Sequence, residues 1–243
     1  MSCRRQTRIR QNAFSETKSP TRPVHGCLME YGKGPMMEWM PNPPDGTPIC
    51  VGFDGSENND WTALKMKTRD GRIFTMRYGP DRRPTIWKPE EWGGRIPRDE
   101  VHAAVDEMMN RYQVRRMYCD PQDWYSEIGE WALNYGSEGC QVLEWPTNQI
   151  KRMYAAIRRF EVDLRQGRIK HDGCPLTVEA MANAKKVAKP GQMYILGKPA
   201  DHQKIDPAMA AIIAHEAAMD AITDGWREER KSTMTVFGRR RGR

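Results

Sequence analysis

Ile49-Cys50-Val51-Gly52-Phe53-Asp54-Gly55-Ser56 is the segment from which the architecture follows most directly. It is a short apolar run that stops on an acidic residue and a glycine. Apolar runs of about four to eight residues between turn signals are typical of buried strands. Pro and Gly at 43–48 break the chain before it, and Gly55 and Ser56 break it afterwards. The segment therefore predicts a central strand with Asp54 at its carboxyl end.

Asp54 is poorly placed for stability, because a carboxylate at the end of a central strand loses water at a high cost in free energy. The same position suits a metal ligand. Ligands bind at the carboxyl edge of open α/β sheets, and hard divalent cations prefer carboxylate oxygens. The sequence thus raises the question of whether other carboxylates meet Asp54 at this edge.

The chain has 243 residues, of which 38% are hydrophobic and 29% are charged. This length and composition predict a soluble globular protein with one large domain or two small ones. No apolar run approaches the roughly 20 residues of a membrane-spanning helix, and no secretory signal opens the chain. The 6 cysteines form no CxxC pair, which favours reduced thiols in a cytosolic protein.

The net charge of +7 is concentrated at the two ends of the chain. Residues 1–48 carry 7 Lys and Arg against 4 acids, residues 227–243 carry 7 against 2, and residues 49–226 carry 25 against 26. We interpret 1–48 as a basic, partly disordered arm or linker, 49–226 as the folded domain and 227–243 as a basic tail. A basic chain suggests nucleic-acid binding, although solvated basic tails are also common.

Hydrophobic periodicity predicts an α/β domain after the Asp54 strand. The expected strands are 61–68, 72–78, 114–120, 141–145 and 193–196, and the expected helices are 97–112, 124–134, 148–165, 176–186 and 206–225. The alternation in 61–68 is typical of a half-buried strand. Asp70-Gly71 is expected to form a two-residue hairpin turn, Asn148 to cap its helix, and 79–97 to form a long ordered loop. The expected sheet is mixed, with an antiparallel meander followed by parallel strands, and helices flank it.

Two further aspartates have positions comparable to that of Asp54. Asp120 ends the predicted strand 114–120, and Asp206 begins the last predicted helix, which could lie across the sheet. Three neighbouring carboxylates repel one another unless a cation lies among them, and Mg²⁺ or Mn²⁺ meets that need. Two such ions about 3.5–4 Å apart can hold the attacking and leaving oxygens of a phosphodiester. Each aspartate also has an ordinary structural explanation, as a turn residue or a helix cap.

Six short motifs lie in order along residues 50–225. They are Gly52-Phe53-Asp54-Gly55-Ser56-x-x-x-Asp60-Trp61-Thr62-Ala63, Met117-Tyr118-Cys119-Asp120-Pro121-x-x-Trp124, Thr147-Asn148-x-x-x-x-Met153, His171-Asp172-Gly173, Asn183-Ala184 and Lys204-Ile205-Asp206-Pro207-Ala208-Met209-Ala210. Together and in this order, they resemble the nuclease domain of the large subunit of tailed-phage terminases.

The resemblance implies an RNase H-like fold and a two-metal endonuclease that cuts concatemeric viral DNA during genome packaging. It implies that Asp54, Asp120 and Asp206 are both the catalytic residues and the ligands of two Mg²⁺ or Mn²⁺ ions. The partners that it implies are double-stranded DNA, a packaging ATPase subunit or domain, the small terminase and the portal. The expected location is the cytoplasm of an infected bacterial host, and no membrane partner is expected.

The sequence departs from the family in one respect. A complete large subunit also carries a packaging ATPase domain, whereas this sequence contains no G-x-x-x-x-G-K-[ST] motif. We therefore expect no ATP site, and a chain that is either a separately encoded nuclease or a fragment. Two alternatives stay open: a Holliday-junction resolvase-like nuclease of the same fold, and a packaging subunit that is inactive without its ATPase and portal partners.

Weaker candidates lie around the three aspartates. Glu57 and Asp60 follow Asp54 and could contact a metal through water, and Asp172 belongs to one of the motifs without an assigned ligand role. Basic side chains near the last helix or on the helix 148–165 could contact the DNA backbone, or they could simply form a solvated face. These candidate DNA-binding residues are Lys198, Lys204, Arg152 and Arg159.

Overall fold

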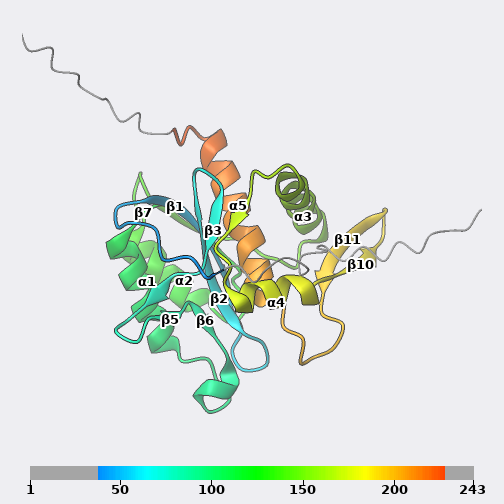
Figure 1. The fold of residues 1–243 in the computed structure, drawn as a ribbon, viewed down its shortest axis with the longest axis horizontal. Coiled ribbons are helices and arrows are strands. Elements are labelled where there is room, and N and C mark those ends of the chain that lie inside the picture. The colour runs from blue at the N-terminus through cyan, green and yellow to red at the C-terminus, as the bar shows by residue number, and fades with distance from the viewer. Residues whose placement is uncertain (1–37, 228–243) are drawn as a thin grey trace, which may run out of the picture.

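β1 (Pro48–Asp54) lies in the middle of a mixed sheet in the computed structural model, which describes residues 38–227 (Figure 1). The strand order is β8-β7-β1-β2-β3-β9, and β6 also pairs with β2. The other strands of this sheet are β2 (Thr62–Thr68), β3 (Arg72–Phe74), β6 (Ile86–Trp87), β7 (Gln113–Cys119), β8 (Gln141–Glu144) and β9 (Lys170–His171). β1 pairs antiparallel with β2 and parallel with β7. The predicted order, antiparallel strands followed by parallel ones, is confirmed.

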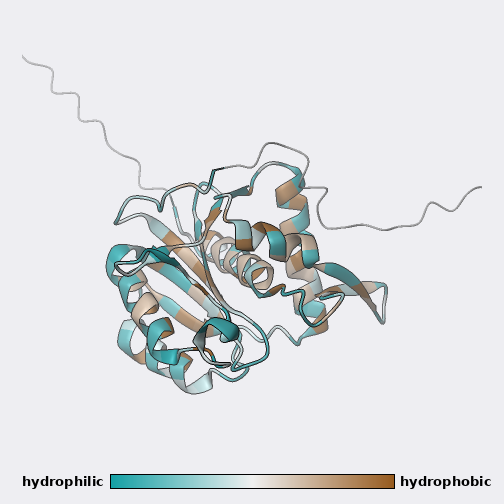
Figure 2. Cartoon of the chain, turned by 60° about the horizontal axis from the view of Figure 1, so that its bottom comes forward, coloured by the Kyte–Doolittle hydropathy of each residue, from teal (hydrophilic) through white to brown (hydrophobic). Residues whose placement is uncertain are grey.

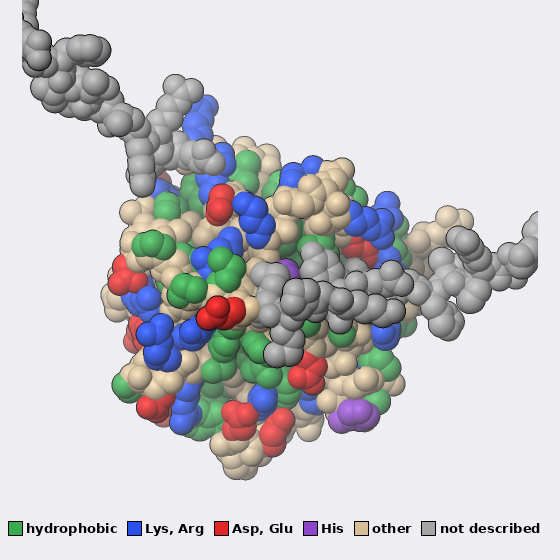
Figure 3. Space-filling view, in the orientation of Figure 1, with side chains coloured by type: hydrophobic (Ala, Val, Ile, Leu, Met, Phe, Trp, Pro, Cys, Tyr) green, Lys and Arg blue, Asp and Glu red, His purple; other side chains and the backbone are tan. Residues whose placement is uncertain are grey.

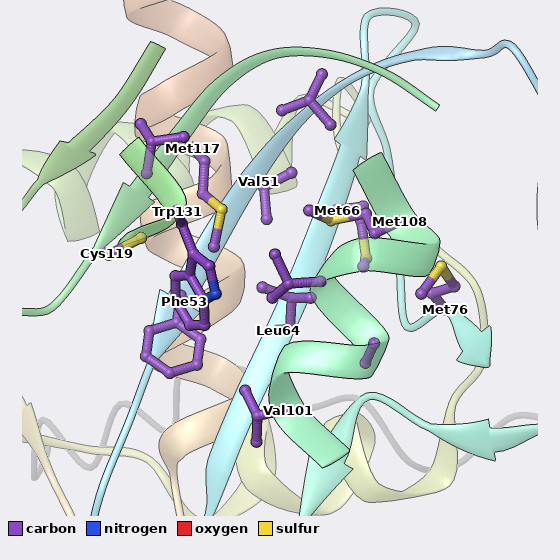
Figure 4. Packing of buried hydrophobic residues seen from close by; sticks show 14 of the residues in the cluster. Val51, Phe53, Leu64, Met66, Met76, Val101, Met108, Met117, Cys119 and Trp131 are labelled. Atoms are coloured by element: carbon purple, nitrogen blue, oxygen red, sulfur yellow. The ribbon is translucent and has the colours of Figure 1, made fainter. Parts of the chain in front are cut away.

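One face of the sheet packs against the first two helices, α1 (Arg98–Arg111) and α2 (Tyr125–Tyr135). Ile49, Val51 and Phe53 of β1 point into this hydrophobic cluster. Figure 4 shows Val51 and Phe53 beside side chains of both helices, among them Trp131 of α2. The alternation of side chains along a strand explains why every second residue of β1 lies here.

The opposite face packs against three helices, α3 (Ile150–Arg165), α4 (Pro175–Asn183) and α5 (Asp206–Thr223). Cys50 belongs to the hydrophobic cluster on this side. The brown, hydrophobic parts of the central strands lie between the two helical layers in Figure 2. The sheet is therefore covered on both faces, as expected of a sheet with parallel strands.

α5 makes its closest approach to the sheet at Gly52. A Cβ atom at this position would lie 2.2 Å from the carbonyl oxygen of Ala210 and 2.3 Å from the backbone nitrogen of Ala214. Only glycine leaves room for the helix backbone at this distance. This contact fixes how α5 lies across β1.

β2 differs from its prediction as a half-buried strand, because all of its residues are buried. Its two lysines are enclosed on the α5 side. Lys65 donates hydrogen bonds to the hydroxyls of Thr177 and Thr75, and Lys67 Nζ lies 2.7 Å from Nδ1 of His215. Burial lowers the pKa of Lys67 to about 8. The alternating pattern could not reveal that a helix covers the polar face, because the lysine partners lie far away in the sequence.

The predicted strand 72–78 is wrong in its second half. Arg77–Tyr78 forms β4, which pairs with β5 (Arg83–Pro84) in a separate two-stranded sheet. Between β3 and β4, the backbone N–H of Thr75 donates to Oδ2 of Asp172 at 2.7 Å. This long-range hydrogen bond replaces a strand ladder, and the chain leaves the main sheet there.

The predicted helix 176–186 is too long. α4 ends at Asn183, and Lys185–Lys189 forms β10, which pairs antiparallel with β11 (Met193–Gly197). The predicted strand 193–196 is confirmed as a strand, but it lies in this separate hairpin and not in the main sheet.

Three local details also differ from prediction. The chain turns between β2 and β3 through the three residues 69–71, with Gly71 at φ 96°, and not through a two-residue turn. α3 begins after Gln149, and Asn148 is not its cap. The predicted loop 79–97 contains β5, β6 and the 3₁₀ helix η1 (Pro89–Trp92).

The predictions for residues 1–37 and 228–243 lie outside the described residues. The described end of the predicted arm packs on the domain, because Trp39 Nε1 donates to Oδ2 of Asp172 at 3.0 Å. Within 38–227, no helix combines the length and apolar character needed to cross a membrane.

Candidate active site

The carboxyl ends of β1 and β7 bring Asp54 and Asp120 together. The two strands are parallel neighbours with Phe53 opposite Cys119, and the N–H of Asp120 donates to the Phe53 carbonyl at 2.9 Å. Tyr118 belongs to the hydrophobic cluster beneath α5. Two residues further on, Asp120 is on the same face, because strand side chains alternate.

α5 brings Asp206 to the same edge. The helix crosses β1 at Gly52, with Ala210 directly above it. Asp206 is one helical turn before Ala210, about 6 Å along the axis. Asp54 is two residues beyond Gly52, about 6.6 Å along the strand. The close approach at Gly52 therefore sets these two carboxylates side by side.

The carboxylates perturb one another. Burial raises the pKa of Asp54 well above its usual range, and the negative charges of Asp206, Asp120 and Asp60 raise it further. Burial, followed by the charge of Asp60, raises the pKa of Asp206 to about 6. Oδ2 of Asp206 is buried and has no hydrogen-bond partner among residues 38–227. The positive charge of Lys204 lowers the pKa of Asp206 but does not offset burial and the charge of Asp60, so these carboxylates favour a bound cation.

Thr147 orients the buried side chain of Asp120. Its hydroxyl donates to Oδ2 of Asp120 at 2.5 Å, and its backbone N–H donates to Oδ1 at 3.4 Å. Thr147 belongs to one of the six sequence motifs, but its role could not be assigned from sequence. The residue lies 27 positions away from Asp120, and only the pairing of β7 with β8 brings it near.

Asp60 is held by two lysines at the same edge. Its Oδ1 atom accepts hydrogen bonds from Lys198 Nζ at 2.6 Å and from Lys204 Nζ at 2.7 Å. Burial alone would raise the pKa of Asp60, but the two lysine hydrogen bonds outweigh it and lower the pKa. Asp60, a weaker candidate from sequence, is thus close enough to Asp54 and Asp206 to affect both.

The residues present fit a divalent cation. The donors are all carboxylate oxygens, which suit Mg²⁺ or Mn²⁺. Among residues 38–227, Oδ2 of Asp206 is buried without a hydrogen-bond partner. An added positive charge would lower the raised pKa values of Asp54 and Asp206. In the part of the chain described here, no three His, Cys, Asp or Glu side chains already converge into a compact metal centre. The site is therefore a set of neighbouring carboxylates, not a closed cage.

The arginines of α3 that were predicted to bind DNA make contacts within the domain. Arg159 lies 3.4 Å from Glu216 and 3.7 Å from Asp220. The Arg152 guanidinium lies 4.4 Å from the centre of the Trp145 ring. Lys and Arg side chains are interspersed with Asp and Glu on the face shown in Figure 3, which has no single basic patch. The role of these two arginines in DNA binding stays a prediction.

Asp172 has a structural role. Its side chain accepts hydrogen bonds from Trp39 Nε1 and from the backbone N–H groups of Thr75 and Cys174. It lies beside β9, which β2 and β3 separate from β1 in the sheet. Glu57, the other weak candidate, is exposed in the loop after β1.

No protein-family model matches the chain. Among curated proteins, the Gene 13 protein of Mycobacterium phage D29 is 31% identical over 186 residues, and the Gene 13 protein of Mycobacterium phage L5 is 30% identical. Each match covers 72% of this chain and 30% of the relative. The chain thus spans less than a third of the length of these relatives.

Solved structures similar to the chain are large terminases. The large terminase nuclease of the thermophilic phage G20c has a TM-score of 0.54 and 12% identity, and covers 74% of this chain and 94% of its own. The large terminase of bacteriophage HK97 has a TM-score of 0.53 and 20% identity, and covers 72% of this chain and 40% of its own. At such identities, these matches establish the fold. The chain has the RNase H-like fold of large terminase nucleases, so the fold that its motifs imply is confirmed.

Proposed function

We propose that this chain is a metal-dependent DNA endonuclease that cuts concatemeric viral DNA during phage genome packaging. The observation that supports the proposal lies at the carboxyl end of β1. The charges of Asp206 and Asp120 add to burial in raising the pKa of Asp54, and Oδ2 of Asp206 is buried without a hydrogen-bond partner among residues 38–227. The relatives in two mycobacteriophages support a phage protein. The proposed location is the cytoplasm of the infected host.

Two divalent cations, when bound, would supply an activated water molecule and stabilise the leaving oxygen of the phosphodiester. A G20c nuclease structure with bound magnesium, which is 13% identical with a TM-score of 0.52, supports a divalent ion. Asp54, Asp120 and Asp206 would hold the ions. Thr147 keeps the Asp120 carboxylate in one orientation.

The raised pKa values give the site a pH dependence. Asp206, with a pKa of about 6, must lose its proton before it can bind a cation. Cation affinity and cleavage should therefore rise as the pH increases through about 6. The choice between Mg²⁺ and Mn²⁺ depends on coordination number and cavity size.

A packaging ATPase subunit or domain, the small terminase and the portal are the proposed partners, in addition to double-stranded DNA. One observation favours a second hypothesis, in which the chain is silent without these partners. The carboxylates of the described residues repel one another and do not form a compact centre. DNA phosphates or a partner could complete the site.

Cleavage of supercoiled plasmid in Mn²⁺, Mg²⁺ or EDTA tests the proposal. Asp54→Asn, Asp120→Asn and Asp206→Asn should each reduce cutting at least 100-fold, because each removes a charged ligand. Asp81→Asn, an exposed aspartate in the β4–β5 turn, is the matched control and should cut like wild type.

Three results would overturn parts of the proposal. Cutting that survives all three substitutions would reject the site. Cutting of four-way junctions in preference to plasmid would indicate a resolvase. A folded wild type that cuts only after a packaging ATPase is added would support the partner-dependent hypothesis.

A further inference from the structure

The turn after β1 brings Asp60 close enough to Asp54 and Asp206 for its charge to raise the pKa of both. Ser56 and Thr62 brace this turn, since the Ser56 N–H donates to Thr62 Oγ1 at 3.0 Å and Thr62 Oγ1 donates to the Ser56 carbonyl at 3.1 Å. The N–H of Asp60 donates to Ser56 Oγ at 3.2 Å. Hydrogen bonds within its own turn therefore hold Asp60 in position.

Two lysines reach Asp60 from the segment between β11 and α5. Lys198 follows β11 directly, and Lys204 precedes Asp206 by two residues. Lys204 is anchored twice more. Its Nζ atom donates to the Asn59 carbonyl at 2.6 Å, and its own carbonyl accepts from Asn183 Nδ2 at 3.1 Å.

The charge count at this contact favours an anionic ligand. Two ammonium groups share one carboxylate, so the trio carries a net charge of +1 next to three carboxylates. Each ammonium has three N–H donors. Asp60 accepts one from each lysine and the Asn59 carbonyl accepts a second from Lys204, so both lysines keep a donor for a ligand. The side chains of Lys198, Lys204 and Asp60 are 29%, 13% and 33% exposed, so solvent and ligands can reach the group.

The negatively charged carboxylates of Asp54 and Asp206 repel the phosphates of an approaching DNA backbone. The ammonium groups of Lys198 and Lys204 beside the carboxylates would offset this repulsion and bind a phosphate. We propose that Asp60 is a positioning residue that holds Lys198 and Lys204 as a phosphate-binding pair beside the candidate active site. This inference rests on the proposed DNA-cleaving function.

The alternative is a purely structural ion pair that fastens the 198–205 segment to the turn after β1. The two roles differ in what a substitution changes. A structural pair affects thermal stability, whereas a phosphate-binding pair affects DNA affinity and its dependence on salt. If Asp60 only repelled DNA, its removal would strengthen DNA binding. If Asp60 positions the lysines, its removal should also release Lys198 and Lys204.

The test is binding of a fluorescein-labelled 30-base-pair duplex, followed by anisotropy in EDTA at several salt concentrations. Lys198→Met and Lys204→Met should each weaken binding about 3- to 10-fold and reduce the slope of log K against log salt by about 1. Lys170→Met is the matched control. It removes the same charge from β9, at the opposite end of the sheet from Asp54, and should change neither value.

A double-mutant cycle tests the role of Asp60. If Asp60 positions the lysines, Lys198→Met should weaken binding less than 2-fold in an Asp60→Asn background. The same factor in both backgrounds would overturn the positioning role. Lysine variants that melt earlier but bind DNA like wild type at a temperature where all are folded would show a structural pair. If the wild-type protein neither binds nor cuts DNA, the proposed function itself is rejected. If the wild-type protein cuts DNA and the lysine variants bind DNA normally, only the phosphate-binding role of the lysines is rejected.

Discussion

Asp206→Asn should stabilise the cation-free protein while it abolishes cation binding. The pKa of Asp206 in the folded protein is about 6, compared with an ordinary value of 3.8. A difference of about 2 units corresponds to about 3 kcal/mol at about 1.4 kcal/mol per unit. The asparagine also loses a favourable interaction of about 0.3–1 kcal/mol between a carboxylate and the N-terminus of α5. We expect a net gain of about 2–3 kcal/mol at pH 7.5.

The difference in stability between Asp206→Asn and wild type depends on pH. Below about pH 3.8, Asp206 is protonated in both the folded and the unfolded chain, so its ionisation does not affect stability. Between about pH 3.8 and 6, the unfolded chain ionises first, and the free energy of unfolding of wild type falls. Above about pH 6 the penalty is constant. The advantage of Asp206→Asn should therefore appear between these values and persist at higher pH.

Urea unfolding in EDTA at pH 4 and pH 7.5 measures this difference, with the exposed Asp201→Asn as the control. Adding Mn²⁺ should raise the free energy of unfolding of wild type but not of Asp206→Asn, because a ligand stabilises only the state that binds it. The reasoning is refuted if Asp206→Asn is less stable than wild type in EDTA at pH 7.5. It is also refuted if the difference between the two proteins is the same at both pH values.

Three further substitutions test the packing around the site. Gly52→Ala would place a Cβ against the backbone of α5, so we expect a loss of about 2–4 kcal/mol in urea unfolding and weaker cleavage; a change below 0.5 kcal/mol would contradict this packing. Thr147→Val should reduce Mn²⁺ affinity about 10- to 100-fold in calorimetry, because Asp120 loses the hydroxyl that orients it. The melting temperature should stay within a few degrees of wild type. Unchanged affinity would count against the orienting role of Thr147. Asp172→Ala should cost about 3–5 kcal/mol, because the buried N–H of Thr75 loses its acceptor, while DNA binding at low temperature stays normal; a stable variant would show that another acceptor takes its place.

The sequence predicted the elements that carry the three aspartates. β1 is an apolar run that ends at turn residues, and β7 ends in apolar residues before Asp120 and Pro121. α5 opens with Asp206-Pro207 and continues mostly in apolar residues. These are local patterns, and local patterns determine where an element lies and ends. The parallel pairing of β1 with β7 then follows from the intervening helix, so the convergence of Asp54 and Asp120 could be expected.

Contacts between distant segments could not be predicted. His215 lies 148 positions from Lys67, and its Nε2 atom is 3.0 Å from Oδ2 of Asp163. Burial, and then the charge of Lys67, lowers the pKa of His215 to about 3. A sequence shows a polar residue at each of these positions, but it does not show which helix covers it.

The second half of the predicted strand 72–78 failed for the same reason. The residues have strand propensity, yet the N–H of Thr75 donates its hydrogen bond to Asp172, which lies 97 positions later in the chain. The pairing of Asp60 with Lys198 and Lys204 is equally non-local. Propensity is a weak guide where a tertiary hydrogen bond competes with a strand ladder.

We propose that β1, β7 and α5 carry Asp54, Asp120 and Asp206 to one cation site. The most direct measurement is a crystal structure of the protein soaked in Mn²⁺, with anomalous data collected at the manganese edge. We expect one or two anomalous peaks with oxygens of these three carboxylates about 2–2.5 Å away, and no such peak in Asp206→Asn. Manganese bound only elsewhere, or no peak beside the three aspartates at a saturating concentration, would contradict it.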